Sequence, residues 1–270
     1  MTWIFEPPHL TGCLLRTAPV LVLGCGRSGT NMMVEILRGS PELLATTNQP
    51  DGDGVEDRAF FQTWNTLSLP AGYLTKNVTA YIQDFDQIAQ VWTKNPHLKI
   101  VWTIRDPRSL ALSKLYRGSP IGDSPAEGSP QLDPTNDANY LGCIRDIVHM
   151  QKLYEQSIRH FPNNNCLVSM EEIILDIDRT IARVCDFCEI EISPDMRHFI
   201  PRYRNHHKAN RYLTLDKSQI NIHLRASEIY DGYFAGQDWR HPSWGDITIE
   251  DLWDALRGCV AYFNYDVDNQ

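Results

Sequence analysis

A glycine-rich turn between an apolar strand pattern and a helical pattern, at residues 20–31, constrains the fold more than any other segment. The run Val20–Leu23 is apolar and rich in β-branched residues, and the turn Gly24–Asn31 follows it directly. Apolar residues then recur at helical spacing. A strand, loop and helix in this order surround an anionic phosphate with backbone N–H groups and a helix N-terminus. The segment therefore predicts a phosphate-binding loop.

The loop departs from the P-loop pattern G-x-x-x-x-G-K-[ST] at informative positions. Gly24 and Gly29 occupy the two glycine positions, but Thr30 replaces the lysine and Asn31 replaces the hydroxyl residue that binds magnesium. The cation of the loop is instead Arg27. Because the groups that hold a γ-phosphate and its metal are missing, we expect a phosphorylated nucleotide that is bound without Mg²⁺.

Short apolar strands alternate with helical stretches along the rest of the chain. This order predicts one α/β domain over residues 1–270, with a central parallel sheet and helices on both faces, as in P-loop NTPase-like folds. The expected strands are Val20–Leu23, Leu43–Thr46, Tyr73–Lys76, Ile100–Ile104 and Cys166–Met170. The expected helices are Asn31–Arg38, Phe85–Trp92, Pro107–Arg117, Ala138–Phe161, Ile177–Phe187 and a last helix from about Thr248 to Phe263.

Two segments interrupt this alternation. Residues 118–137 are rich in glycine and proline and predict a long mobile loop, which is either a lid over the site or a surface insertion. Residues 211–245 are rich in aromatic and charged residues with weak periodicity, and they predict no particular element.

Charge and cysteine content exclude several classes of protein. The net charge of −9 leaves no electrostatic footprint for nucleic acid and disfavours anionic membrane surfaces. The sequence shows neither a signal peptide nor an apolar run of about 20 residues, so a cytoplasmic protein is expected. Its 7 cysteines are odd in number and fit reduced thiols, and the C-x-x-C pair Cys185 and Cys188 is interpreted as two buried residues on one helix face.

A second phosphate-binding motif follows the strand at residues 100–104. Arg105 stands at the carboxyl end of this strand, Pro107 begins a helix, and Ser113 lies 8 residues beyond Arg105. A guanidinium that binds two oxygens, together with a hydroxyl from the next helix, suits a terminal phosphate.

The pair of motifs, Gly24–Asn31 and Arg105–Ser113, resembles the sulfotransferases that use 3′-phosphoadenosine 5′-phosphosulfate (PAPS). The resemblance continues at Tyr73–Lys76, at Val168–Ile173 and at the end of the last helix in Phe263-Asn264-Tyr265. It is fainter for bacterial tailoring sulfotransferases that act on guanidinium alkaloids. It implies PAPS as the co-substrate, 3′,5′-ADP as the product and no metal.

The resemblance also implies the residues of the donor site. Arg105 and Ser113 would bind the 3′-phosphate, and Lys76 would act near the bridging oxygen together with Arg27. A basic segment near the C-terminus would assist, and the candidates there are Gly236–Arg240, Arg204, Lys208 and Arg211. The residues that would line the 5′-phosphosulfate are Gly26, Arg27, Ser28, Gly29, Thr30 and Asn31.

Transfer of a sulfuryl group by in-line displacement needs a base for the acceptor proton. Glu56 is our first candidate, with Asp57 and Asp53 behind it, because these residues follow the second strand. His97 precedes the amino end of a strand, which is the wrong side of the sheet. A solvated acidic loop without a catalytic role is the alternative interpretation of residues 51–57.

The acidic loop also bears on the acceptor. Carboxylates at the mouth of the site would attract a small cationic acceptor, such as an amine or a guanidinium compound. A carbohydrate acceptor, a module that binds the nucleotide without catalysis and, less favoured, a P-loop kinase stay open as alternatives.

Overall fold

The computed structural model describes residues 17–45, 57, 59–108, 110–111, 140–197 and 249–265. A parallel sheet of five strands forms its centre, in the order β2-β3-β1-β4-β5. The strands are β1 (Val20–Gly24), β2 (Leu44–Ala45), β3 (Tyr73–Val78), β4 (Lys99–Ile104) and β5 (Asn165–Ser169). Both neighbours of the central strand β1 run parallel to it.

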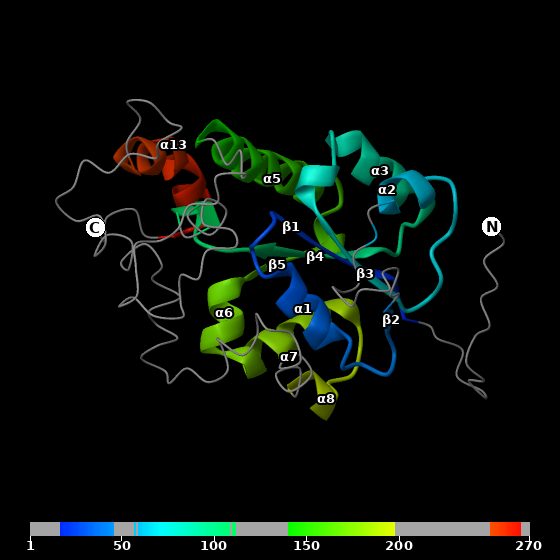
Figure 1. Cartoon of the computed structure of the whole chain (residues 1–270). Coiled ribbons are helices and arrows are strands. Elements are labelled where there is room, and N and C mark those ends of the chain that lie inside the picture. Colours follow the sequence, from blue (N-terminus) through cyan, green and yellow to red (C-terminus); the bar gives the residue numbers. More distant parts are fainter. Residues whose placement is uncertain are drawn as a thin grey trace, which may run out of the picture.

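Helices cover both faces of this sheet, as Figure 1 shows. One face carries α1 (Thr30–Leu37), α6 (Met170–Leu175), α7 (Ile177–Cys188) and α8 (Pro194–Arg197). The other carries α2 (Phe60–Thr63), α3 (Phe85–Lys94), α5 (Tyr140–His160) and α13 (Ile249–Tyr262). The short 3₁₀ helices η1 (Thr79–Tyr81) and η2 (Pro162–Asn164) complete the described elements. The predicted fold class is confirmed.

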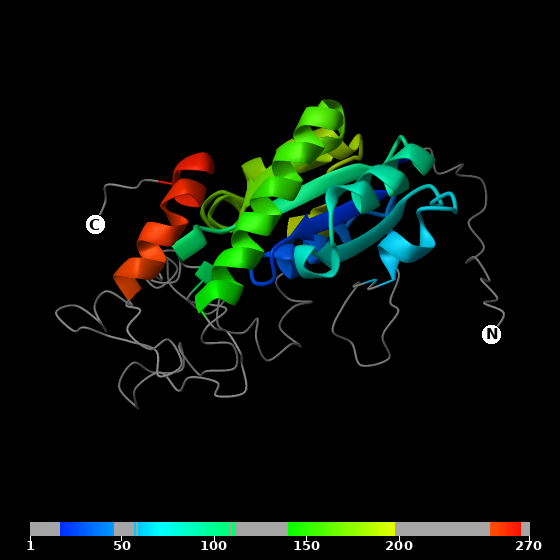
Figure 2. The same cartoon turned by 90° about the horizontal axis from the view of Figure 1, so that it is seen from above.

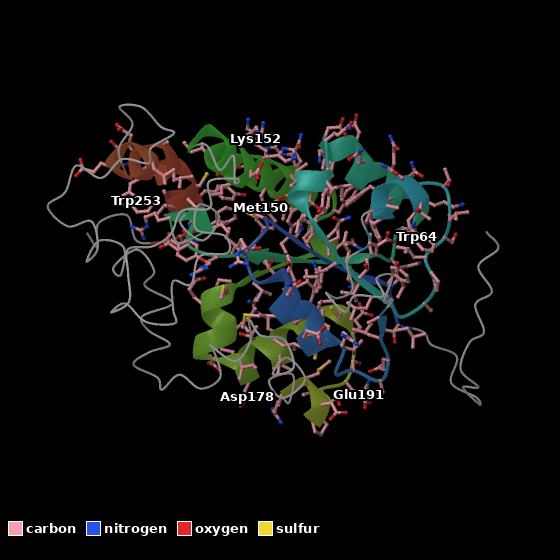
Figure 3. The ribbon with its side chains drawn as sticks, in the orientation of Figure 1. Trp64, Met150, Lys152, Asp178, Glu191 and Trp253 are labelled. Atoms are coloured by element: carbon pink, nitrogen blue, oxygen red, sulfur yellow. The ribbon has the colours of Figure 1, made fainter. Side chains whose placement is uncertain are left out.

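Alternation along each strand divides the core into two parts. In β1, Val20 and Val22 pack on the α1 side, whereas Leu21 and Leu23 pack on the opposite side. On that opposite side α5 crosses the sheet and places Met150 in the core, and α13 packs beside α5 (Figures 2 and 3). Because both faces are covered, every residue of β1 is buried.

The strand order reverses at β1, since the chain passes first to the β3 side and later to the β4 side. Ligands of open α/β sheets bind beyond the carboxyl ends of the strands at such a point. The loop after β1 and the turn after β4 lie at this edge, which makes it the candidate site.

Several elements differ from the predicted ones. β3 continues to Val78, and β5 ends at Ser169 because Met170 begins α6. The side chain of Ser169 accepts a hydrogen bond from the Glu172 N–H, and the Glu172 carboxylate accepts one from the Ser169 N–H. This capping box stops the strand and begins the helix.

Candidate functional site

The loop after β1 has the backbone of an anion site. Arg27 has φ 81° and Gly29 has φ 99°, so two residues adopt the left-handed region. Gly29 precedes α1, whose N-terminus has neither a side-chain cap nor an acidic residue in its first turn. The N–H groups at this end of α1 and the helix dipole can therefore favour an anion.

The predicted residues of this loop divide into buried and accessible ones. Ser28 and Thr30 are buried, Gly26 and Gly29 are partly exposed, and Arg27 and Asn31 are exposed. The Ser28 hydroxyl lies 2.8 Å from the Thr103 hydroxyl of β4. Thr103 was not among the predicted site residues, because a single threonine inside an apolar strand has no distinctive sequence pattern.

Lys76 of β3 is buried, with only 3% of its surface exposed. It pairs in register with Val22 of β1, two residues before the phosphate loop begins. Its parity along β3 matches Leu74, which packs in the core on the α1 side. The lysine thus extends from the sheet on the face that the phosphate loop and α1 share.

The turn after β4 contains two arginines with different surroundings. The guanidinium of Arg108 donates two hydrogen bonds to the Asp106 carboxylate, at 3.0 and 2.7 Å, and the Arg108 N–H donates a third at 2.9 Å. Arg108 is thereby bound to its neighbour in the turn. Arg105 is 7% exposed and stands directly at the end of β4. Its position at the carboxyl end of β4, the strand that pairs with β1, favours Arg105 as the anion ligand of the turn.

Glu171 of α6 supports the same turn. Its Oε1 accepts a hydrogen bond from the Asp106 N–H at 3.0 Å, and its Oε2 accepts one from the Tyr265 hydroxyl at 2.8 Å. Burial raises the pKa of Glu171, while these hydrogen bonds and the nearby charge of Arg105 act in the opposite direction. Neither Glu171 nor Tyr265 was among the predicted site residues.

Asp57 is buried beside β3. Its carboxylate accepts hydrogen bonds from the Ala59 N–H at 3.1 Å and from the Trp64 indole and the Tyr73 hydroxyl at 3.2 Å each. The Asp57 carbonyl accepts another from Asn77 at 2.9 Å. These contacts favour a structural role for this carboxylate, and its catalytic role stays a prediction. Trp64, which Figure 3 labels, packs on Tyr73, with ring centroids 5.2 Å apart.

Other predicted residues lie elsewhere in the fold or outside the described part. His97 is exposed in the turn before the amino end of β4, away from the candidate site. Cys185 and Cys188 are both buried on α7. The predicted residues outside the described ranges are Asp53, Glu56, Ser113, Arg204, Lys208, Arg211 and Gly236–Arg240, together with the predicted loop at 118–137 and the segment 211–245.

The described ranges contain neither a candidate membrane-spanning helix nor a candidate metal centre. None of the helices there combines the length and the hydropathy that a membrane span requires. In the same ranges, no three acidic, histidine or cysteine side chains gather where they could hold a metal ion.

Known structures resemble this chain in fold. Mouse sulfotransferase SULT7A1 complexed with PAP matches with a TM-score of 0.50 and 15% identity, over 91% of this chain and 89% of that one. Sulfotransferase STF9 from Mycobacterium avium matches with a TM-score of 0.52 and 13% identity, over 94% and 79% of the two chains. The sulfotransferase domain from the curacin biosynthetic pathway matches with a TM-score of 0.50 and 12% identity, over 93% of this chain and 99% of that one.

The family is shown by the sequence itself. Comparison with curated proteins gives no match. The profile of the sulfotransferase domain matches residues 17–240, which include the phosphate loop, Lys76 and the turn at Arg105. This match confirms the predicted enzyme class, a sulfotransferase. The chain belongs to the sulfotransferase domain family.

Proposed function

We propose that the protein transfers a sulfuryl group from PAPS to a hydroxyl or amine of a small, positively charged acceptor. The observation that supports PAPS as the donor is that the two proposed anion sites follow neighbouring strands. The phosphate loop follows β1 and the buried Arg105 follows β4, and β1 pairs with β4 directly. Adjacent strands are only about 5 Å apart, so one nucleotide with phosphate groups on the 3′ and 5′ positions of its ribose can reach both sites.

The loop residues would hold the 5′-phosphosulfate and Arg105 the 3′-phosphate. The open N-terminus of α1 suits the 5′ group, because its N–H groups have no side-chain cap. Ser113 and Arg211, which lie outside the described residues, remain proposed partners of the 3′-phosphate. PAPS supplies the sulfuryl group and a leaving group, and Arg27 and Lys76 would stabilise the negative charge that develops on the leaving oxygen.

We assign the base to Glu56, which immediately precedes Asp57 in the chain. The N–H of Asp57 donates to the Lys76 carbonyl at 3.3 Å, so the end of the acidic segment at residues 51–57 is bound to the carboxyl end of β3. The acceptor oxygen or nitrogen attacks sulfur, the bond from sulfur to the bridging oxygen breaks, and Glu56 takes the acceptor proton.

The acidic segment also supports the cationic acceptor. Asp51, Asp53 and Glu56 carry three negative charges within 6 residues, in a chain whose net charge is already −9. The negative potential of these carboxylates raises the local concentration of cations, and added salt weakens this effect by screening the charges. An amine or guanidinium acceptor is therefore favoured over a carbohydrate.

Incubation of the full chain with PAPS and a panel of acceptors in EDTA tests these assignments. We expect a sulfated amine or guanidinium product, detected by mass spectrometry, with a rate that falls as salt increases. Equal rates for cationic and neutral acceptors at every salt concentration would refute the cationic acceptor. Tight binding of 3′,5′-ADP with no product across the panel would indicate a non-catalytic module. Phosphoryl transfer from ATP that EDTA abolishes would indicate a kinase.

A further inference from the structure

Beyond the end of helix α13, the side chain of Tyr265 reaches Glu171, which contacts the turn that carries Arg105. The body of α13 packs on the far side of the core, where Leu252, Leu256 and Cys259 are buried. After the helix ends, the Tyr265 N–H donates to the Val260 carbonyl at 2.9 Å, which folds the chain back. The phenol then donates to Glu171 at 2.8 Å, across 94 residues of sequence.

Glu171 connects this phenol to the turn that carries Arg105. One carboxylate oxygen accepts from Tyr265 and the other accepts from the N–H of Asp106, the residue after Arg105. The Asp106 side chain is engaged by Arg108, so the Glu171 contact acts on the backbone of the turn. The position of that peptide determines where the Arg105 side chain leaves the end of β4.

The Glu171 carboxylate depends on its hydrogen-bond donors because it is partly buried. Loss of the Tyr265 hydroxyl would leave the partly buried carboxylate of Glu171 with one donor fewer. Burial already raises the pKa of Glu171, and burial together with the charge of Glu171 raises the pKa of Tyr265, so the phenol stays a donor. Without the phenol, the Glu171 carboxylate could accept hydrogen bonds from other donors. Arg105 is a candidate, because its positive charge already acts to lower the pKa of Glu171. An Arg105 drawn to Glu171 would be less available to a phosphate.

We propose that Glu171 and Tyr265 are positioning residues for Arg105, so that the C-terminal turn after α13 sets the affinity for the 3′-phosphate of the nucleotide. This inference rests on the proposed function of Arg105 as the ligand of that phosphate. It assigns the turn after α13 a part in donor recognition, although the helix itself packs against α5.

Calorimetric titration of the full chain with 3′,5′-ADP and with 5′-AMP tests the proposal. We expect Tyr265→Phe to weaken 3′,5′-ADP binding about three- to tenfold and to leave 5′-AMP binding unchanged. The matched control is Tyr262→Phe, which also removes a phenol hydroxyl. Tyr262 belongs to α13, and its ring packs on Tyr154 and Phe263. This control should leave both affinities unchanged. Glu171→Gln should repeat the selective loss.

A double-mutant cycle separates positioning from general destabilisation. In an Arg105→Ala background, Tyr265→Phe should cause no further loss of 3′,5′-ADP affinity. Equal weakening of both nucleotides, or an unchanged affinity for 3′,5′-ADP, would overturn the proposal while leaving the proposed function intact. If the wild-type protein itself bound the two nucleotides equally, the 3′-phosphate site would be wrong, and the inference would fail with it.

Discussion

The hydroxyls of Ser28 and Thr103 lie 2.8 Å apart in the interior, where both residues are completely buried. The two residues are 75 positions apart in sequence, and their contact joins the phosphate loop to β4. Gly24 lies in register with Thr103 at the start of the loop. The loop is therefore fixed to the strand that carries Arg105, so both proposed anion sites depend on one local packing arrangement.

Gly24→Ala should disrupt that arrangement. A Cβ at this position would meet Thr103 Oγ1, Ser28 Oγ at 2.5 Å and the Thr103 carbonyl oxygen at 2.6 Å. We expect the free energy of unfolding to fall by about 1–3 kcal/mol, as in other overpacked interiors. Urea denaturation measures this change, and Gly26→Ala is the matched control because a Cβ there meets nothing within 4 Å. A similar loss in both variants would show that the tight packing at Gly24 is not the cause.

Local patterns were sufficient to predict the parallel sheet and the loop between β1 and α1. The β-branched run of β1 and the glycines after it have a period and a composition that few other structures share. The end of β5 could also have been predicted, because Ser169 and Glu172 form the S-x-x-E pattern of a capping box. Long-range polar contacts could not be predicted from the sequence. The pair Ser28 and Thr103 and the pair Glu171 and Tyr265 have no local sequence pattern that marks them as partners.

Arg105→Ala should weaken the binding of 3′,5′-ADP about 10- to 100-fold, because a hydrogen-bonded contact between charged groups contributes about 1.5–3 kcal/mol. Binding of 5′-AMP, which lacks the 3′-phosphate, should change little. Calorimetry gives both affinities. Arg197→Ala is the control, since its guanidinium pairs with Asp178 in an exposed position on α8. An unchanged affinity for 3′,5′-ADP in Arg105→Ala would move the 3′-phosphate site elsewhere.

Arg105→Lys distinguishes charge from geometry at the same position. Lysine keeps the positive charge but lacks the planar guanidinium that binds two oxygens at once. We expect an affinity for 3′,5′-ADP between those of the wild type and Arg105→Ala. A lysine variant as tight as the wild type would show that a point charge is sufficient.

Asp57→Asn and Glu56→Gln are adjacent, equivalent substitutions with opposite expected effects. The amide that replaces the Asp57 carboxylate would face hydrogen-bond donors, so the Trp64 indole or the Tyr73 hydroxyl would lose its acceptor. We expect the free energy of unfolding to fall by about 1–3 kcal/mol and turnover to persist in the folded protein. Glu56→Gln should keep its stability and lower kcat by about 100- to 10,000-fold, as loss of a general base does. Loss of turnover in Asp57→Asn at full stability would assign the base to Asp57 instead.

Alkaline pH should destabilise the protein through the buried thiol of Cys185. Burial raises the pKa of this thiol to about 11, and its sulfur lies 3.5 Å from the Met196 sulfur. The folded state holds the thiol proton to higher pH than the unfolded state does. The contribution of this thiol to the free energy of unfolding is therefore fully present below about pH 9 and is lost as the pH rises through about 11. Between pH 8 and 10.5 this thiol should account for about 1–2 kcal/mol of lost stability. Urea titrations of the wild type and Cys185→Ala at several pH values isolate this contribution, and the variant should show the shallower decline. Parallel declines in the two proteins would mean that other groups cause the alkaline loss.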